Sequence, residues 1–477
     1  MHGSCRILRS LLLVACMSQS LTPGPLPAEE PTGDDVPSAE AVDYREAIAL
    51  LRAAIEQEME AKDLPALSIA VVDGDRIVWA EGFGFVDPKS TIRAKPETVY
   101  RVGSISKLFT DLALMKLVER GEIDLEAPVT NYLPEFAPQN PFDRPVTLRA
   151  LTSHHSGLVR ESPVGNYFDD SEPTLAETVA SLNRTALVYP PGEKTKYSNA
   201  GIAVLGAVLE RKTGVPYDRW MTREILEPLG MRRSGFVATE ALKRDLATGW
   251  MWTYDGRRFE APPFALGTAP AGNLYSDVLD LAKFVQFLFE TEPRASAPVQ
   301  PETLRQMMTL PEGKDEGFGI GFHVRKLDGE KLVGHGGAVY GFATELMALP
   351  ERKAGVVVAT SLDCANGVAG RLGEYALRLV LAARKGEELP SYQVTSAVPA
   401  VRARELVGVY QGEDGFVEVT ELSGGGLSEA GAVSTRGPRE AGRSVAGSGR
   451  RVRLRGGGEP ERAGSADRRF GEVRPSA

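Results

Sequence analysis

Three short groups of residues in this sequence have types and spacings that could perform acyl transfer. The first is Ser104-Ile105-Ser106-Lys107, at the start of a predicted helix that follows a short strand. Residues three apart share one face of a helix, so the Lys107 amine can reach the Ser104 hydroxyl. A lysine kept neutral by burial can take the serine proton, and the free N–H groups of the first helical turn can stabilise an oxyanion. This spacing favours Ser104 as a nucleophile.

The second group is Tyr197-Ser198-Asn199, which follows a Pro-Pro-Gly turn and precedes a helical run. A tyrosine hydroxyl can relay a proton between a nucleophile and a leaving group, and an asparagine amide can donate to a substrate carbonyl. Taken alone, the triplet is better explained by a turn tyrosine and a helix-capping asparagine. Its interpretation therefore depends on the other two groups.

The third group is Gly334-His335-Gly336-Gly337-Ala338, at the end of a predicted strand. Glycines let the backbone of a strand approach a ligand closely. The Ala338 N–H could then complete an oxyanion hole with the N–H of the nucleophile, and His335 could hold a carboxylate or steer protons. A glycine-rich hairpin without a catalytic role is the alternative.

The elements that must position these groups alternate between strand and helix patterns. The first ordered segments are a helix over 44–62 and a hairpin of strands over 67–72 and 76–80. Helical segments with Pro- and Gly-rich connections fill about 111–270, and a helix follows over 277–290. Apolar strands return at 318–324, 331–334, 342–349 and 355–361, before a helix over 367–383. This order predicts an α+β domain over 43–385 with a helical insertion.

The three groups, in this order, resemble the serine β-lactamase and penicillin-binding protein superfamily, specifically its class C-like branch. The resemblance runs over about 44–381 and includes the following flanking segments: YRVGS at 100–104, DLEAPV at 124–129, YLP at 132–134 and LTSHHSGL at 151–158. It implies a β-lactamase/DD-peptidase-like fold, an antiparallel sheet flanked by helices plus an inserted helical domain, with the site in the cleft between them.

Carried over to this chain, the resemblance implies a role for each residue of the three groups. Ser104 is expected to be the nucleophile, Lys107 its proton partner and Tyr197 the general base and acid. The substrate-binding residues are expected to be Asn199, His335, Gly336, Gly337 and Ala338. No cofactor and no metal are expected, and the neighbouring His154 and His155 are predicted to have structural roles because a metallohydrolase site needs three well-spaced ligands.

The strand motif departs from that of class C β-lactamases, which have a lysine where this chain has His335. A lysine keeps a fixed positive charge for a substrate carboxylate, whereas a histidine near its usual pKa of about 6.5 is mostly neutral at pH 7. We therefore expect a D-Ala-D-Ala carboxypeptidase or esterase ahead of a β-lactamase. A non-catalytic protein of the same fold that binds penicillin or cell-wall peptides is the alternative.

The composition is consistent with a small-molecule or peptide substrate. The formal net charge is -9 and the sequence pI is about 5.4, which leaves no basic face for nucleic acid. Of the three cysteines, only Cys364 lies within the predicted domain, and we expect it to be a small buried side chain.

The N-terminal residues predict export. Arg6 and Arg9 precede an apolar run over 11–15, which is typical of a signal peptide over 1–16. Leu13-Val14-Ala15-Cys16 also resembles a bacterial lipobox, so lipidation of Cys16 and membrane attachment are as well supported as simple cleavage. The protein is expected in the periplasm, as a membrane-anchored lipoprotein or secreted. Residues 17–42, rich in Pro, Gly, Asp and Glu, are predicted to form a disordered linker.

The C-terminal part divides into two segments. Apolar alternation over 386–422 predicts a small, partial β module. Residues 423–477 contain eleven Arg, no Lys and a single aromatic residue, Phe470, so too little apolar surface is available for a core. A disordered basic tail is predicted, with a change of reading frame as the alternative.

Overall fold

The computed structural model describes residues 42–253, 256–311, 313–393, 405–412, 415–422, 426–432 and 450–451. Its centre is a seven-stranded sheet in the order β2-β1-β11-β10-β9-β8-β7, with antiparallel neighbours throughout. The strands are β1 (Ala66–Asp73), β2 (Arg76–Gly84), β7 (Gly317–Phe318), β8 (His323–Leu327), β9 (Glu330–Val339), β10 (Phe342–Leu349) and β11 (Ala354–Thr360). The first hairpin pairs with strands from far along the chain, which confirms the predicted fold class.

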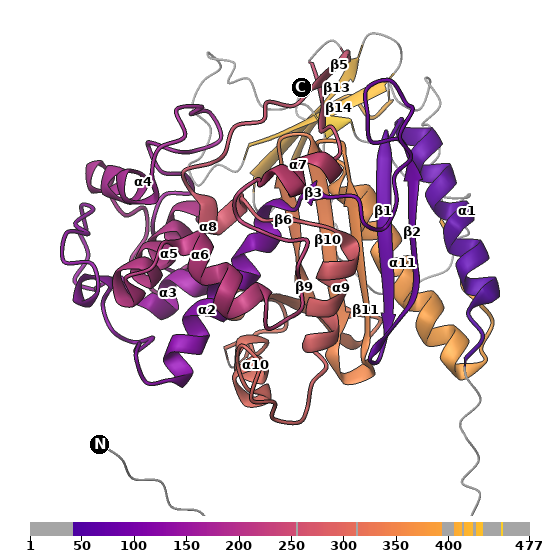
Figure 1. Cartoon of the computed structure of the whole chain (residues 1–477). Helices are drawn as coiled ribbons and strands as arrows, with labels where there is room; N and C mark the ends of the chain where they lie inside the picture. Colours follow the sequence, from indigo (N-terminus) through magenta and orange to yellow (C-terminus); the bar gives the residue numbers. More distant parts are fainter. Residues whose placement is uncertain are drawn as a thin grey trace, which may run out of the picture. The chain divides into compact units, whose positions relative to one another are not determined.

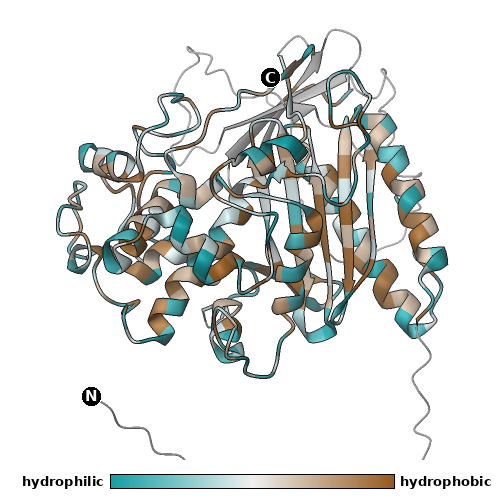
Figure 2. Cartoon of the chain, in the orientation of Figure 1, coloured by the Kyte–Doolittle hydropathy of each residue, from teal (hydrophilic) through white to brown (hydrophobic). Residues whose placement is uncertain are grey.

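Two helices, α1 (Arg45–Lys62) and α11 (Asn366–Lys385), lie side by side on one face of the sheet (Figure 1). Successive side chains of a strand point to opposite faces of the sheet. Leu67 and Ile69 of β1 therefore pack in the core beneath these two helices, whereas Ala70 belongs to the core on the opposite face. Apolar segments predominate along the central strands, and polar residues line the outer side of α1 (Figure 2). The sheet is therefore buried on both faces.

The helical region covers the opposite side, with α9 against β1 and β11 and the insertion beyond it (Figure 1). Every residue of helix α2 from Ser106 to Leu117 is buried, so this helix lies inside the core on all of its sides. The helices are α2 (Ser106–Glu119), α3 (Leu148–Thr152), α4 (Leu175–Ser181), α5 (Asn199–Thr213), α6 (Tyr217–Met221), α7 (Glu240–Asp245), α8 (Ala269–Gly272), α9 (Val278–Phe287) and α10 (Pro301–Met307).

The remaining strands belong to smaller sheets. Two small pairs join β3 (Tyr100–Arg101) to β6 (Tyr275–Ser276) and β4 (Trp250–Trp252) to β5 (Arg258–Glu260). A separate four-stranded sheet contains β12 (Gly408–Gly412), β13 (Gly415–Leu422), β14 (Gly426–Ala432) and β15 (Arg450–Arg451). In the described part of the chain, no helix has both the length and the apolar character needed to cross a membrane.

Some local predictions differ from the structure. The strand predicted over 318–324 is two strands, β7 and β8, because the chain turns at Gly321 with φ +79°. Strands β14 and β15 occupy part of the segment predicted to be a disordered tail, where β14 pairs with β13 and β15 pairs with β14. Cys364 is exposed rather than buried. The signal peptide, Cys16 and nearly all of the predicted linker, together with most of the tail, lie outside the described residues.

Candidate active site

Ser104 lies in a short 3-10 turn, η1 (Gly103–Ile105), that leads directly into α2. The spacing of three brings the Lys107 amine to the Ser104 hydroxyl, with Nζ 2.9 Å from Oγ. Gly103 adopts φ +53°, and a Cβ on it would come within 2.8 Å of the Ala338 backbone. The turn therefore needs glycine so that the serine can approach the strand motif.

The Lys107 side chain is fully buried. Its Nζ also donates to the carbonyl oxygen of Ala271 in α8 at 2.7 Å, and Thr110 anchors the same segment by donating to the Pro270 carbonyl oxygen at 2.6 Å. Burial lowers the pKa of Lys107 to about 7; the charge of Glu161 opposes this shift and that of Arg160 adds to it. Near neutral pH a large fraction of Lys107 is therefore an uncharged amine that can accept a proton.

Tyr197 precedes α5, whose N-terminus is capped by the Ser198 side chain accepting from the Gly201 N–H at 2.8 Å. The tyrosine ring packs against His154, with centroids 4.3 Å apart, and Lys107 Nζ lies 4.9 Å from the ring centroid. Burial raises the pKa of Tyr197, although its hydrogen bond with Ser104 partly offsets the effect. Tyr197 is thus a protonated phenol at neutral pH, suited to relaying a proton.

Asn199 begins α5 and is buried, but its amide is already engaged within the protein. Its Nδ2 donates to Glu161 Oε1 at 2.6 Å, while its Oδ1 has no hydrogen-bond partner among the described residues. Asn199 can therefore still accept through Oδ1 and donate through the second hydrogen of Nδ2. Ser198, not Asn199, caps the helix.

Glu161 is a site residue that no pattern in the sequence predicts. It follows the Ser-Gly-Leu segment in a loop, and only the fold brings its carboxylate to Asn199. The same carboxylate lies 3.3 Å from Nε of Arg160, its neighbour in the sequence. Burial raises the pKa of Glu161, while hydrogen bonding from Asn199 opposes the shift. Arg160 in turn lies over the Tyr197 ring, 4.9 Å from the centroid. The charged pair thus lies directly beside the three predicted catalytic residues.

The strand motif lies along β9, close to the nucleophile. A Cβ on Gly337 would lie 2.0 Å from the Val102 carbonyl oxygen, so this glycine permits the strand to contact the turn before Ser104. Tyr167 donates its hydroxyl to the Ala338 carbonyl oxygen at 3.0 Å, which shows that this carbonyl points away from β10. The N–H and C=O of one residue in an antiparallel strand point to the same side, so the Ala338 N–H also faces the site.

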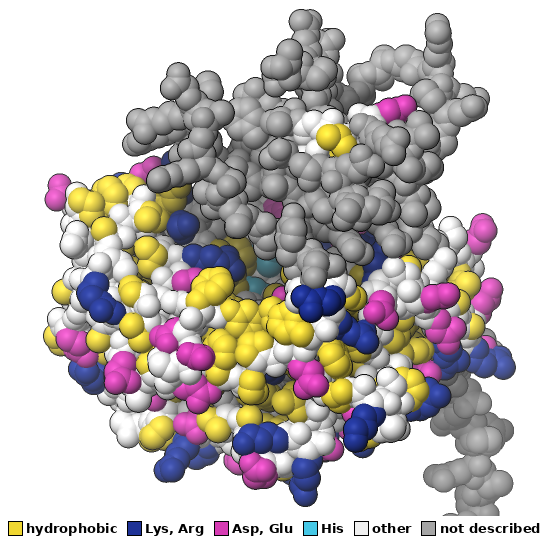
Figure 3. All heavy atoms as spheres, turned by 90° about the horizontal axis from the view of Figure 1, so that it is seen from above, with side chains coloured by type: hydrophobic (Ala, Val, Ile, Leu, Met, Phe, Trp, Pro, Cys, Tyr) yellow, Lys and Arg dark blue, Asp and Glu magenta, His cyan; other side chains and the backbone are white. Residues whose placement is uncertain are grey.

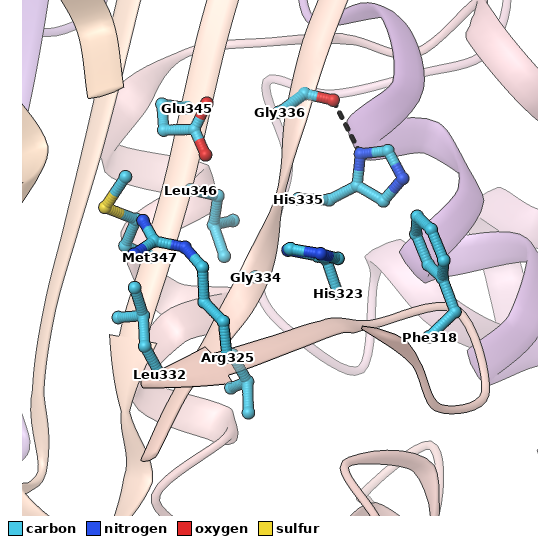
Figure 4. A pocket seen from close by; sticks show the side chains of 11 residues that line it. Phe318, His323, Arg325, Leu332, Gly334, His335, Gly336, Glu345, Leu346 and Met347 are labelled. Carbon is cyan, nitrogen blue, oxygen red and sulfur yellow. Dashed lines mark hydrogen bonds between the residues drawn. The ribbon is translucent and has the colours of Figure 1, made fainter. Parts of the chain in front are cut away.

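His335 is buried and does not provide a positive charge. Its Nδ1 lies 2.5 Å from the Gly336 carbonyl oxygen, which accepts only if Nδ1 carries the proton (Figure 4). Burial and, to a smaller extent, the charge of Lys107 together lower the pKa of His335 to about 3. The expectation that His335 could hold a carboxylate is therefore not met. Its Nε2 lacks a partner among the described residues and can accept a hydrogen bond.

Aromatic packing completes the site. His154 has the structural role that was predicted, because its ring supports Tyr197 and its Nδ1 accepts from the Ser198 N–H at 3.3 Å. Phe318 of β7 contacts the rings of His154, Tyr197 and His335, at centroid distances of 4.8, 5.9 and 6.1 Å, and sequence patterns do not identify it. Histidine side chains lie in a hollow at the centre of one molecular face, beside apolar side chains (Figure 3).

The antiparallel sheet, its helical insertion and the serine-lysine-tyrosine group beside β9 define the fold of β-lactamases and penicillin-binding proteins. The family model named Beta-lactamase matches residues 51–380, and the chain belongs to this family of β-lactamase-fold serine hydrolases. The order of the three motifs alone had indicated this superfamily, and the match confirms it.

Curated relatives include Protein flp of Staphylococcus aureus (strain N315), which is 24% identical over 310 residues, covering 65% of this chain and 62% of the relative. Beta-lactamase-like protein 2 of Dictyostelium discoideum is 30% identical over 325 residues, covering 65% of this chain and 58% of the relative. The chain thus spans less than two thirds of the length of these curated relatives.

Solved structures of the same fold include an octameric penicillin-binding protein homologue from Pyrococcus abyssi. It is 31% identical, with a TM-score of 0.65, and the match covers 80% of this chain and 87% of that one. EstCE1, described as a hydrolase with promiscuous acyltransferase activity, is 22% identical with a TM-score of 0.58, covering 69% of this chain and 98% of that one. At that identity the likeness shows the fold alone.

Proposed function

We propose that the protein hydrolyses esters or amides through an acyl-enzyme formed on Ser104. The observation that carries this proposal is the contact of 2.9 Å between the Ser104 hydroxyl and the Lys107 amine, whose pKa burial lowers to about 7, so that much of the amine is neutral at pH 7 and can accept a proton. A lysine on the surface would be charged at neutral pH and could not take the proton.

The proposed mechanism has two halves. In acylation, neutral Lys107 takes the Ser104 proton, Oγ attacks the carbonyl carbon, and the leaving group departs with a proton that passes through Tyr197 from Lys107. The N–H groups of Ser104 and Ala338 stabilise the oxyanion. In deacylation, a water molecule gives a proton to Lys107 and Tyr197 and attacks the acyl carbon. The same groups return the proton to Ser104 Oγ as its bond to the acyl carbon breaks, which releases the acid and restores the free hydroxyl. Each turnover consumes one water molecule.

The substrate class that we favour is an ester or a D-amino-acid peptide of the D-Ala-D-Ala carboxypeptidase type, ahead of a β-lactam. A neutral His335 offers no fixed charge for a substrate carboxylate, which a β-lactam and a D-Ala-D-Ala peptide both carry, so this observation favours the ester most. Among the solved structures of this fold, EstCE1 is described as a hydrolase and the Pyrococcus abyssi protein as a penicillin-binding protein homologue. These descriptions are compatible with an ester and with a D-amino-acid peptide as the substrate.

Two further proposals come from the sequence. A non-catalytic protein that binds penicillin or cell-wall peptides is the second candidate, since such a protein would be acylated and then stall.

Export, with either cleavage or lipidation at Cys16, remains our proposal for localisation. Mass spectrometry of the mature N-terminus would distinguish a lipid-modified cysteine from a cleaved peptide.

The direct test of the activity is intact-mass spectrometry after exposure to a fluorophosphonate, a penicillin and a p-nitrophenyl ester, with product release measured in parallel. We expect one adduct in the wild type, none in Ser104→Ala, and retention of the adduct in Ser106→Ala. Ser106 is a matched control because its buried hydroxyl donates to the Gly103 carbonyl oxygen at 2.6 Å and is not directed to Lys107. An adduct without turnover would favour the binding protein; no adduct with any probe would refute both.

A further inference from the structure

A cavity of about 140 Å³ adjoins the proposed active site at the end of β8. Strand β8 pairs with β9 only as far as His323 and Gly334, so β9 continues past its partner at His335. The cavity occupies this position, lined by Phe318, His323, Arg325, Leu332, Val333, Gly334, His335, Gly336, Glu345, Leu346 and Met347 (Figure 4). Phe318 and His335 line the cavity and also contact the Tyr197 ring, so the cavity shares two residues with the surroundings of the catalytic group.

Glu345 is the acidic residue of this cavity. It lies on β10 directly opposite Gly336, and a Cβ on that glycine would lie 2.8 Å from Glu345 Oε2. The missing side chain at Gly336 thus makes room for the carboxylate beside the strand motif. No hydrogen bond or ion pair joins the Glu345 carboxylate to another residue in the described part of the chain, and the nearby Arg325 is paired with Glu374 instead. A partly buried carboxylate without a partner is costly, and a ligand that donates hydrogen bonds would remove that cost.

The other charges around the cavity are balanced within the protein. Arg325 donates to Glu374 at 2.8 Å, so its guanidinium is already paired with a carboxylate. Burial lowers the pKa of His323, and burial also keeps His335 neutral, so neither ring carries a charge at neutral pH. Burial raises the pKa of Glu345 to about 7, with Arg325 opposing the shift and Glu374 adding to it. When Glu345 ionises, the cavity therefore has one unmatched negative charge.

The remaining walls are apolar, from Phe318, Leu332, Leu346 and Met347, and a cavity of about this volume holds a group the size of a benzene ring. Glu345 lies opposite Gly336, two residues from Ala338 and hence roughly 7 Å along the strand from the proposed oxyanion site.

We infer that this cavity is a substrate subsite that binds a primary ammonium group at the end of a short apolar chain, with Glu345 as its counter-ion. The inference rests on the proposed acyl transfer by Ser104 and adds the class of acyl group.

The test compares two esters that differ only in charge, p-nitrophenyl 6-aminohexanoate and p-nitrophenyl heptanoate. An alkyl ammonium stays charged well above neutral pH. We expect the wild type to prefer the amino ester by about tenfold in kcat/KM at pH 8, the size of one charge-assisted contact. In Glu345→Gln the ratio should fall toward one. Glu316→Gln should keep the wild-type ratio, because its exposed carboxylate lies outside the cavity wall, 3.5 Å from His323 Nε2.

A second measurement needs no variant. In the wild type, the ratio of the two kcat/KM values should rise between about pH 6 and pH 8 as Glu345 ionises, while the dependence on Lys107, common to both esters, cancels from the ratio. A wild type that hydrolyses the heptanoate but shows no preference at any pH would overturn the subsite and leave the proposed function standing. Failure to hydrolyse either ester, with no adduct on Ser104, would instead refute the proposed function.

Discussion

Asn199 donates its side-chain amide to the Glu161 carboxylate at 2.6 Å, which holds a negative charge beside the serine-lysine pair. The same carboxylate lies 3.3 Å from Arg160 Nε. The two charged residues act on Lys107 in opposite directions, since Glu161 raises the pKa of the amine and Arg160 lowers it. The protonation state of Lys107, the proposed base, therefore depends on the charges of the adjacent residues Arg160 and Glu161.

This arrangement predicts opposite pH shifts for two neutralising variants. Glu161→Gln removes the charge that favours the ammonium form, so Lys107 should lose its proton at lower pH and the acid limb of kcat/KM should move to lower pH. Arg160→Gln should move the same limb to higher pH. Profiles of ester hydrolysis between about pH 5 and pH 9 report these changes in the free enzyme. Shifts of both variants in one direction would show that the charges do not act on Lys107.

Tyr197→Phe should remove proton transfer to the leaving group while keeping the fold. The ring contacts with His154 and Phe318 do not require the hydroxyl. We expect kcat/KM, which reports acylation and not deacylation, to fall by about 10²–10⁴ for an alkyl ester, the usual contribution of general acid–base catalysis. The loss should be smaller for a p-nitrophenyl ester, because nitrophenolate leaves without a proton. Equal losses for both esters would instead indicate that the hydroxyl positions Ser104.

Gly337→Ala should damage the site through the backbone. The added Cβ would lie 2.0 Å from the Val102 carbonyl oxygen, so the strand motif must move away from Ser104. A displacement of this kind can cost about 100-fold in rate, and we expect a loss of that order in kcat/KM together with a lower Tm. Gly370→Ala is the control, because a Cβ there meets nothing within 4 Å on α11. It should stabilise the helix by about 0.5–1 kcal/mol, measured by urea unfolding, without changing activity.

Asp111 predicts a dependence of stability on pH. It lies one turn after Lys107 on α2, is fully buried, and neither carboxyl oxygen has a hydrogen-bond partner among the described residues. Burial raises the pKa of Asp111 well above its usual value, and the charge of Lys107 opposes the shift. Below about pH 3.9, the usual pKa of an aspartate in an unfolded chain, Asp111 is protonated in both the folded and the unfolded protein. Above that pH, the unfolded protein loses the proton while the folded protein keeps it. The free energy of unfolding therefore falls as the pH rises.

Asp111→Asn removes this titration and keeps the shape of the protonated acid. The stability of the variant relative to the wild type should therefore increase as the pH rises above about 4, as measured by urea unfolding at several pH values. A difference that stays constant with pH would mean that Asp111 titrates equally in the folded and unfolded states.

Much of the fold and part of the site were predictable from local sequence because they depend on local rules. The contact between Ser104 and Lys107 follows from a spacing of three at the start of a helix, which places both side chains on one face whatever surrounds it. The sheet and its two covering helices follow from apolar periodicity. The turn at Gly321, which divides the predicted strand over 318–324, shows the limit of that rule, since periodicity does not reveal a single residue with φ +79°.

The properties that decide the chemistry of the site depend on contacts between distant segments. The order of motifs alone determined the family and the positions of Ser104, Lys107 and Tyr197. Only the tertiary structure brought Glu161 to Asn199, placed Glu345 opposite Gly336, and buried His335 so that it stays neutral. Burial and the distance to other charges set a pKa, and both are properties of the folded protein rather than of the residue type.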